Sequence, residues 1–87
     1  MASYELAFKK SLTRDLRSIP NEDVMRILER IQALAHDPRP PGCEKLSGQE
    51  RYRIRQGVYR IVYEIEDRHL MVLVVKVGHR RKIYRRP

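Results

Sequence analysis

The pattern of apolar and polar residues predicts a strand followed by a helix at the start of the chain. Tyr4, Leu6 and Phe8 alternate with polar or small neighbours, and this period of two is typical of a strand. Apolar residues then recur every three or four positions, which predicts a first amphipathic helix over about residues 9–18. Pro20 cannot continue a helix, so it separates this helix from the next one.

A second and longer amphipathic helix is predicted directly after this proline. Asn21 is expected as its N-cap, and apolar residues follow at helical spacing from Val24 to Ala35. The helix is expected to end near His36, because residues 37–42 contain three prolines and a glycine. The apolar stripes of the two helices are interpreted as core.

The second half of the chain predicts an antiparallel meander. Turns at Gly57 and at residues 66–68 separate three strands, which are expected at residues 52–56, 58–65 and 69–77. Gly78 is expected to end the last strand. The order strand–helix–helix–three strands in 87 residues predicts a single α+β domain over residues 1–87, with both helices packed on one face of a small sheet.

Alternation along the predicted strands sorts the side chains of the meander onto two faces. One consistent solution packs the Tyr/Ile/Leu/Val set against the helices and leaves an open face with four cations and three valines: Arg53, Arg55, Arg60, Lys76, Val62, Val72 and Val74. Arg80 and Tyr84 are expected at its edge. Exposed strands often carry charged side chains only to prevent association. Cations mixed with apolar residues favour a binding surface instead.

Charge and composition narrow the class of partner. Residues 1–50 contain eight Lys/Arg and eight Asp/Glu, whereas residues 51–87 contain eleven and three, so the whole net charge of +8 lies in the second part. Most of these cations are arginines, which pair well with phosphate and stack on bases. The single Cys43 and the absence of a signal-peptide pattern predict a cytoplasmic protein. No apolar run reaches membrane-span length, and the scattered histidines offer no metal-ligand spacing, so neither membrane, metal nor cofactor is expected.

Four short motifs and a tyrosine follow one another in the second half: Lys45-Leu46-Ser47-Gly48, Tyr52-Arg53-Ile54-Arg55, Tyr59-Arg60-Ile61-Val62-Tyr63, Val77-Gly78-His79-Arg80-Arg81 and Tyr84. In this order, and in a chain of this length, they resemble the RelE/ParE superfamily of toxins from type II toxin–antitoxin systems. The resemblance extends over essentially the whole chain.

The resemblance to the RelE branch implies an endoribonuclease that cuts mRNA in the ribosomal A site, through attack of a 2′-hydroxyl on the adjacent phosphate, without metal. It implies five catalytic residues: Arg53, Arg55, Arg60, Arg80 and Tyr84. Further basic residues are expected to bind RNA: Lys45, Arg51, Lys76, Arg81, Lys82 and Arg85. The implied partners are the ribosome, mRNA and a RelB-like antitoxin, which is expected to be acidic and partly disordered.

One departure from the family pattern concerns proton transfer. Members suited to acid–base catalysis carry lysines where this chain has Arg53 and Arg55, and an arginine with a pKa above about 12 is a poor proton acceptor. His79 is the nearest candidate for the base, since a histidine pKa of about 6.5 suits proton transfer. Lys45 and Lys82 are weaker candidates.

Two alternatives remain open at this stage. A ParE-type toxin would share the fold, bind DNA gyrase and cut no RNA. Arginines at 60 and 80 with a tyrosine at 84 favour the RelE branch over it. A non-catalytic RNA-binding relative is favoured by the arginines at positions 53 and 55.

Overall fold

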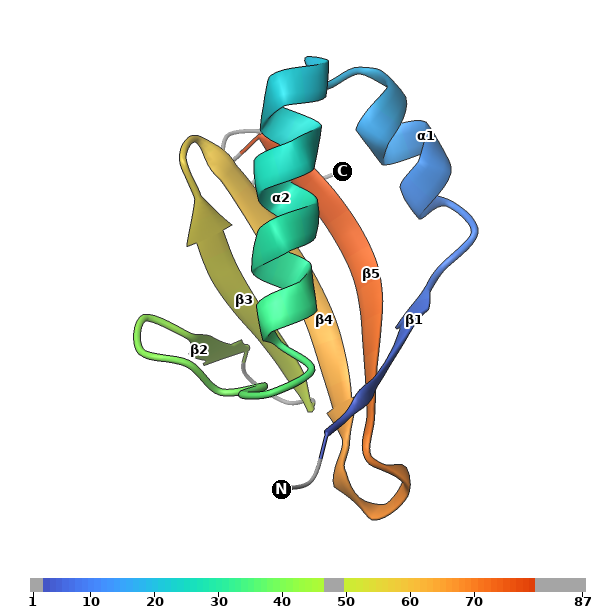
Figure 1. The fold of residues 1–87 in the computed structure, drawn as a ribbon, viewed down its shortest axis with the longest axis vertical. Helices are drawn as coiled ribbons and strands as arrows, with labels where there is room; N and C mark the ends of the chain where they lie inside the picture. The colour runs from blue at the N-terminus through green and yellow to red at the C-terminus, as the bar shows by residue number, and fades with distance from the viewer. Residues whose placement is uncertain (1–2, 47–49, 80–87) are drawn as a thin grey trace.

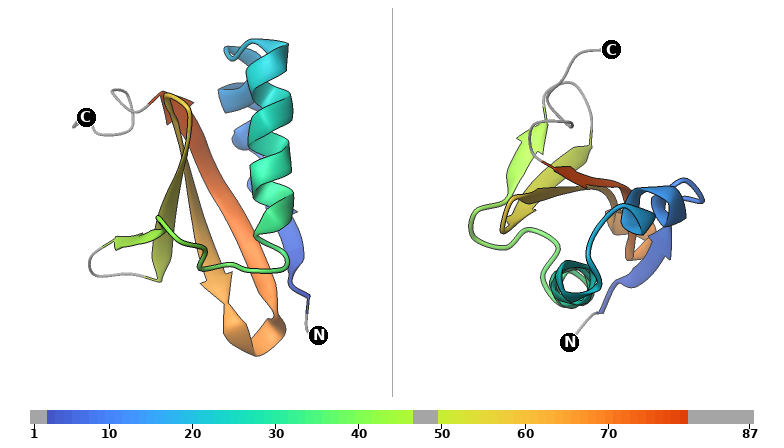
Figure 2. Two further views of the ribbon diagram at one scale, coloured as in Figure 1. Left: turned by 60° about the vertical axis from the view of Figure 1, so that its left-hand side comes forward. Right: turned by 90° about the horizontal axis from the view of Figure 1, so that it is seen from above.

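Five strands form one mixed sheet, and both helices cover the same face of it (Figures 1 and 2). The computed structural model describes residues 3–46 and 50–79. Its elements in chain order are β1 (Glu5–Phe8), α1 (Leu12–Arg17), α2 (Asn21–Ala33), β2 (Glu44–Leu46), β3 (Arg51–Gln56), β4 (Tyr59–Glu66), η1 (Asp67–His69) and β5 (Met71–His79). The strand order in the sheet is β1-β5-β4-β3-β2. The predicted α+β class, with two helices on one sheet face, is confirmed.

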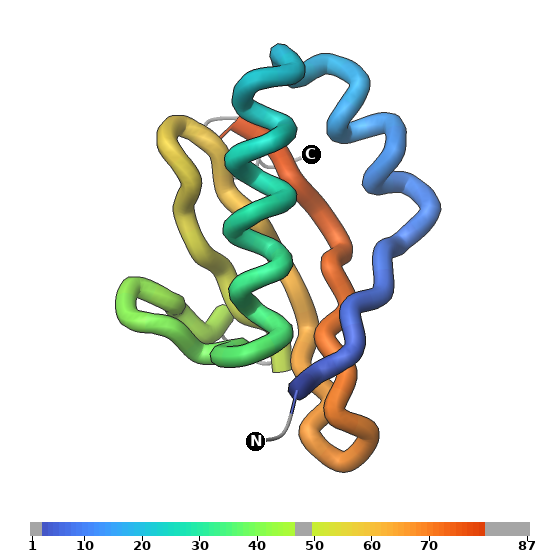
Figure 3. Tube along the Cα trace, in the orientation of Figure 1, coloured from blue at the N-terminus to red at the C-terminus, as the bar shows by residue number. Residues whose placement is uncertain are grey.

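The first and last strands of the sheet lie side by side. β1 pairs with β5 in parallel, whereas the other pairs are antiparallel. A parallel pair needs a crossover connection, and here almost the entire chain supplies it, as the tube in Figure 3 shows. β5 is therefore an interior strand, bonded to β1 on one side and to β4 on the other.

The helices are shorter than the sequence pattern predicted. α1 begins at Leu12 because the chain is still extended at Lys9, whose N–H donates to the carbonyl of Val74 and continues the β1–β5 ladder. α2 begins at Asn21, so Pro20 and not Asn21 is the capping residue. A proline fits this position because it has no N–H to leave unpaired.

The strands also differ from the prediction in two places. β2 was not predicted, because three residues are too few to show alternation. They form a strand only because Glu44 lies opposite Arg53 and Leu46 opposite Arg51 on β3. Gly78 does not end β5, which remains paired with β4 as far as His79.

The core lies between α2 and the sheet. The buried face of α2 presents Ile27 and Ile31, and Leu34 follows as its C-cap; all three are fully buried. Opposite them, the helix-side residues of the three central strands complete one cluster: Tyr52, Ile54, Ile61, Tyr63, Ile65, Val72, Val74 and Val77. This burial gives most of the stabilisation that a chain of this size can obtain.

A β-bulge in β5 changes which of its side chains face the core. Val62 lies opposite Lys76 but Tyr63 lies opposite Val74, so β5 has one extra residue, Val75, at this step. The alternation of β5 is therefore different on the two sides of the bulge. Val72 and Val74 are fully buried on the helix side. Their predicted place on the open face was wrong.

The open face has other apolar residues in their place. Leu73 lies opposite Glu64 and Met71 lies opposite Glu66, on the side away from the helices. Val62 and Lys76 are on the open side, as expected, because Val62 opposes Arg53 on one neighbour and Lys76 on the other.

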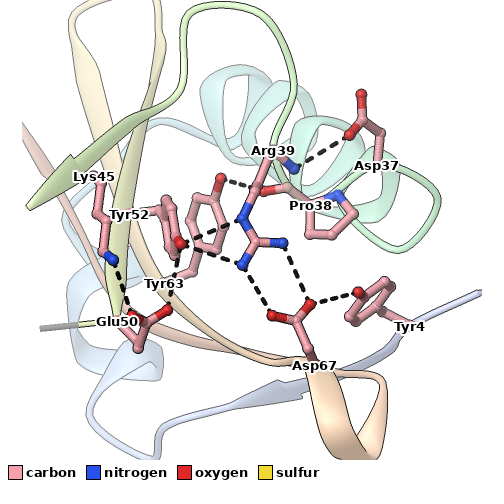
Figure 4. Close-up of polar contacts among 9 residues, drawn as sticks. All are labelled: Tyr4, Asp37, Pro38, Arg39, Lys45, Glu50, Tyr52, Tyr63 and Asp67. Carbon is pink, nitrogen blue, oxygen red and sulfur yellow. Dashed lines mark hydrogen bonds and ion pairs between the residues drawn. The ribbon is translucent and has the colours of Figure 1, made fainter.

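A polar network closes the end of the sheet away from the β3–β4 hairpin (Figure 4). The guanidinium of Arg39 lies 5.0 Å from the ring centroid of Tyr52, donates to the Tyr52 hydroxyl, and pairs with Asp67 at 3.0 Å. The Tyr4 hydroxyl donates to the same carboxylate at 2.7 Å. Hydrogen bonds from Arg39 and then from Tyr4 lower the pKa of Asp67. The network thus joins three segments: the connection after α2, the start of the chain and the β4–β5 turn.

One buried tyrosine anchors the connection after α2 to the sheet. Tyr63 is fully buried, and its hydroxyl donates to the carbonyl of Pro38 at 2.7 Å. Burial raises the pKa of this phenol, so it keeps its proton and remains a donor. The same hydroxyl also lies 3.3 Å from the sulfur of Cys43, which is a weak acceptor. Loss of the bond to Pro38 would therefore leave a buried hydroxyl poorly satisfied, which costs about 1–3 kcal/mol.

The bulge predicts the relative cost of three truncations in β5. Val72→Ala and Val74→Ala should each lower the free energy of unfolding by about 1–3 kcal/mol, because each empties a fully buried site. Leu73→Ala removes a larger side chain but should cost less, because Leu73 is on the open face. Urea denaturation measures all three. A greater loss for Leu73→Ala than for both valines would contradict the bulged register.

Candidate nucleic-acid interface

Two arginines face each other across the β3–β4 hairpin. Gly57 adopts φ +62 at the first position of the two-residue turn, a conformation that glycine adopts without strain. This turn sets the register in which Arg55 lies opposite Arg60, both on the open face. Arg55 is exposed, whereas Arg60 is 5% exposed and is the one charged side chain that is buried in the described part of the chain.

Arg53 completes what we call the arginine face: Arg53, Arg55 and Arg60, on the sheet surface opposite the helices. Arg53 forms an ion pair with Glu44 of β2, and its side chain is 13% exposed. Burial, followed by repulsion from Arg55, lowers the pKa of the Arg53 guanidinium. The arginine face therefore concentrates positive charge in a partly desolvated place, where an anionic ligand would relieve the repulsion.

Carboxylates neutralise part of the predicted basic surface. Arg51 pairs with Glu64 directly across the β3–β4 ladder at 2.7 Å. Glu44 and Glu64 were not identified from the sequence as members of the site. The hairpin register alone could have revealed Glu64, but Glu44 reaches Arg53 only through the unpredicted strand β2.

Both predicted RNA-binding lysines of the described chain are paired away from the arginine face. Lys45 lies 2.9 Å from Glu50, and this hydrogen bond raises the pKa of its ammonium group. Lys76 extends toward α1, where its nitrogen lies 3.8 Å from Asp15. Neither lysine is directly beside Arg55 or Arg60 in the sheet.

His79 lies on the other face of the sheet. It is opposite Tyr59, and the two rings meet edge to face with centroids 6.1 Å apart. The Tyr59 hydroxyl in turn donates to Asp23 of α2, which fixes this pair on the helix side. The structure therefore does not bring His79 together with the arginine face. The remaining predicted residues lie outside the described chain: Arg80, Arg81, Lys82, Tyr84 and Arg85.

No three His, Cys, Asp or Glu side chains in residues 3–46 and 50–79 are placed to hold a metal ion. Within these same residues, no helix is long and apolar enough to cross a membrane.

Comparison with known proteins gives consistent matches over nearly the whole chain. The family model described as the ParE toxin of the type II toxin–antitoxin system parDE matches residues 6–84. The toxin RelG of Mycobacterium tuberculosis is 32% identical to this chain, and the match covers 95% of this chain and 98% of the relative.

Solved structures show the same fold. The RelBE2 toxin–antitoxin complex of Mycobacterium tuberculosis contains a chain with a TM-score of 0.81 and 27% identity, covering 91% of this chain and 93% of that one. The archaeal RelE–RelB complex of Pyrococcus horikoshii gives a TM-score of 0.77 and 25% identity, with 90% and 96% covered. The small α+β fold with its arginine face is thus that of a type II toxin. The chain belongs to the RelE/ParE superfamily of toxin–antitoxin systems.

The ion pair at Arg53 predicts an effect of removing its carboxylate. Glu44→Gln should strengthen binding to a polyanion such as polyuridylate by roughly 2–5-fold, the size of an exposed pair interaction, because a carboxylate then no longer offsets the charge of Arg53. Fluorescence anisotropy at fixed salt measures the affinity. Glu29→Gln, an exposed residue of α2, makes the same charge change elsewhere. An equal gain in both variants would mean that only net charge matters.

Proposed function

We propose that this toxin is a ribosome-dependent endoribonuclease that cuts mRNA in the A site and so stops translation. The observation that carries the proposal is the pair of facing arginines, Arg55 and Arg60, with Arg53 on the same surface. The match to RelG and to RelE chains supports the RelE branch.

The proposed chemistry is attack of a 2′-hydroxyl on the adjacent phosphate. This step increases negative charge on the phosphate oxygens, and positioned cations stabilise that charge best where water is excluded. Arg60 suits this task, because its guanidinium is already buried and loses little solvation when RNA binds. Arg55 is exposed and suits initial capture of the backbone. Arg80 and Tyr84 are proposed as further members of the site on the resemblance alone.

The identity of the base is constrained by the position of His79. The His79 side chain faces Tyr59 on the helix side of the sheet. It can therefore contact RNA only where the RNA passes around the end of the sheet. We therefore assign most of the catalysis to charge stabilisation by the arginine face and to positioning of the mRNA by the ribosome.

An antitoxin is the proposed partner. RelBE2 and the Pyrococcus RelE–RelB structure are toxin–antitoxin complexes, which supports a RelB-like partner for this chain. With a net charge of +8 the toxin favours an acidic partner, and a partly disordered one could wrap so small a domain. Because the proposed target is the ribosome, the toxin is proposed to act in the cytoplasm.

Inhibition of DNA gyrase is the second candidate. It is favoured by the description of the matching family model, ParE of parDE. Ribosome profiling during induced expression separates the two functions. Cuts in A-site codons support the nuclease, whereas DNA damage without RNA cuts supports the gyrase inhibitor.

The proposal predicts that RNA cleavage depends on the ribosome and does not depend on a metal ion. Protein that has been treated with EDTA and dialysed should cut mRNA on programmed ribosomes as fast as untreated protein, and should leave naked RNA nearly intact. Primer extension locates and quantifies the cuts. Efficient cutting of naked RNA, or loss of ribosomal cutting that added metal restores, would overturn this proposal.

The proposal also predicts that loss of Arg60 slows cleavage. Arg60→Ala should slow cleavage on the ribosome by about 10²–10³-fold, as expected for loss of one group that stabilises the transition state. Arg17→Ala, on the exposed side of α1, is the matched control and should cut at the wild-type rate. Because Arg60 is buried, thermal unfolding must show that the variant folds, and Arg60→Lys should recover part of the rate. Wild-type cleavage by folded Arg60→Ala would refute the assignment.

A further inference from the structure

A cleft of about 470 Å³ lies between α1 and the ends of β4 and β5, away from the arginine face. Its volume is within the usual range for small-molecule sites. Ser18, Ile19, Val77 and Gly78 form part of its wall, and its charged and aromatic lining residues are Arg14, Asp15, Tyr59, Lys76 and His79. Arg14 and Tyr59 have no part in the site proposed above.

Asp15 of α1 builds the floor of this cleft. β1 ends opposite Val74, so the β5 residues beyond it have no strand on that side. The Asp15 carboxylate takes the place of a strand there by accepting a hydrogen bond from the N–H of Val77 at 3.2 Å. Its side chain is 16% exposed and its other oxygen lies 3.8 Å from the nitrogen of Lys76. The one acid of the cleft is therefore already engaged.

The walls of the cleft combine aromatic rings with cations. Tyr59 is held by its hydrogen bond to Asp23 at 3.2 Å and meets His79 edge to face. Arg14 is exposed, and the side chain of Lys76 is 55% exposed. Rings that stack on unpaired bases, beside cations that follow the backbone, are the combination by which proteins bind single-stranded nucleic acid.

The cleft is also continuous with the arginine face around the end of the sheet. Tyr59 directly precedes Arg60 in β4, and Gly78 lies opposite Arg60 in β5. Both Tyr59 and Gly78 line the cleft. RNA that extends from Arg60 past this end of the sheet would therefore contact the cleft next, because the cleft begins at the residues beside Arg60.

We propose that this cleft is a second nucleotide subsite. It binds one unpaired nucleotide of the RNA that flanks the segment on the arginine face, with the base against Tyr59 and His79 and a phosphate against Arg14. The inference rests on the proposed function in taking RNA as the ligand. It goes further in assigning the edge of the sheet beside α1 to RNA binding.

The test compares two arginines of the same short helix. The probe is fluorescent 2′-O-methyl hexauridylate, which cannot undergo 2′-hydroxyl attack, and anisotropy gives its Kd between about 50 and 200 mM salt. Arg14→Gln should raise the Kd roughly 2–5-fold and reduce the slope of log Kd against log salt by about 0.7, the value for one lost phosphate contact on a single strand. Arg17→Gln, exposed on α1 but outside the cleft, should change neither quantity.

Two further measurements separate the cleft from general charge effects. Arg14→Gln should bind a 2′-O-methyl dinucleotide like wild type, because so short a probe occupies the arginine face alone. Tyr59→Leu should weaken hexamer binding by roughly 5–100-fold through loss of base stacking, with folding confirmed by nuclear magnetic resonance.

Several results would overturn the subsite. These are no measurable binding of the hexamer by wild type, an equal loss in Arg14→Gln and Arg17→Gln, or no loss in Arg14→Gln. Cleavage on programmed ribosomes is measured separately with wild-type protein. Cleavage without Arg14-dependent binding rejects the subsite alone, and Arg14-dependent binding without cleavage rejects the nuclease alone.

Discussion

The extra residue in β5 opposite the Val62–Tyr63 step is the constraint on which both faces of the sheet depend. Before it, Val72 and Val74 contribute to the core, and after it Val77 does so. A regular strand would place its helix-side residues at every second position, and Val74 and Val77 are three apart. The bulge thus lets one strand fill the core at both ends while Lys76 stays opposite Val62. β1 ends opposite Val74, so the last residues of β5 extend beyond it and meet α1 instead of a strand.

The charges on the open face are arranged unevenly along the sheet. Near the network of Arg39 and Asp67, cations and carboxylates are matched, so that end is close to neutral and contributes to stability. At the hairpin end, Arg55 and Arg60 face each other, and like charges directly opposite destabilise a sheet. Groups held at a cost to the folded state are typical of functional sites, because ligand binding recovers the lost free energy.

The sequence predicted the fold class because its strongest signals are local. The helical spacing of α2, the proline before it and Gly57 at the hairpin each specify one element without knowledge of the others. Arg53, Arg55 and Arg60 were correctly grouped, because they belong to one hairpin whose register follows from its turn. The errors lie in β5, which is apolar at almost every position and so gives no sign of a bulge. The carboxylate of Glu44 was missed for a related reason, since its strand exists only through pairing with β3.

The adjacency of the first and last strands has a consequence for synthesis of the protein. Glu5 pairs with Met71, so the pairing of β1 must wait until most of the chain has been made. A nascent chain without β5 lacks an interior strand of its sheet. Both β1 and the edge of β4 that pairs with β5 then have no hydrogen-bonding neighbour. Contacts so distant in sequence also form late during folding. The complete sheet therefore forms only after almost the whole chain has been made, so a partly synthesised chain does not yet contain the folded domain.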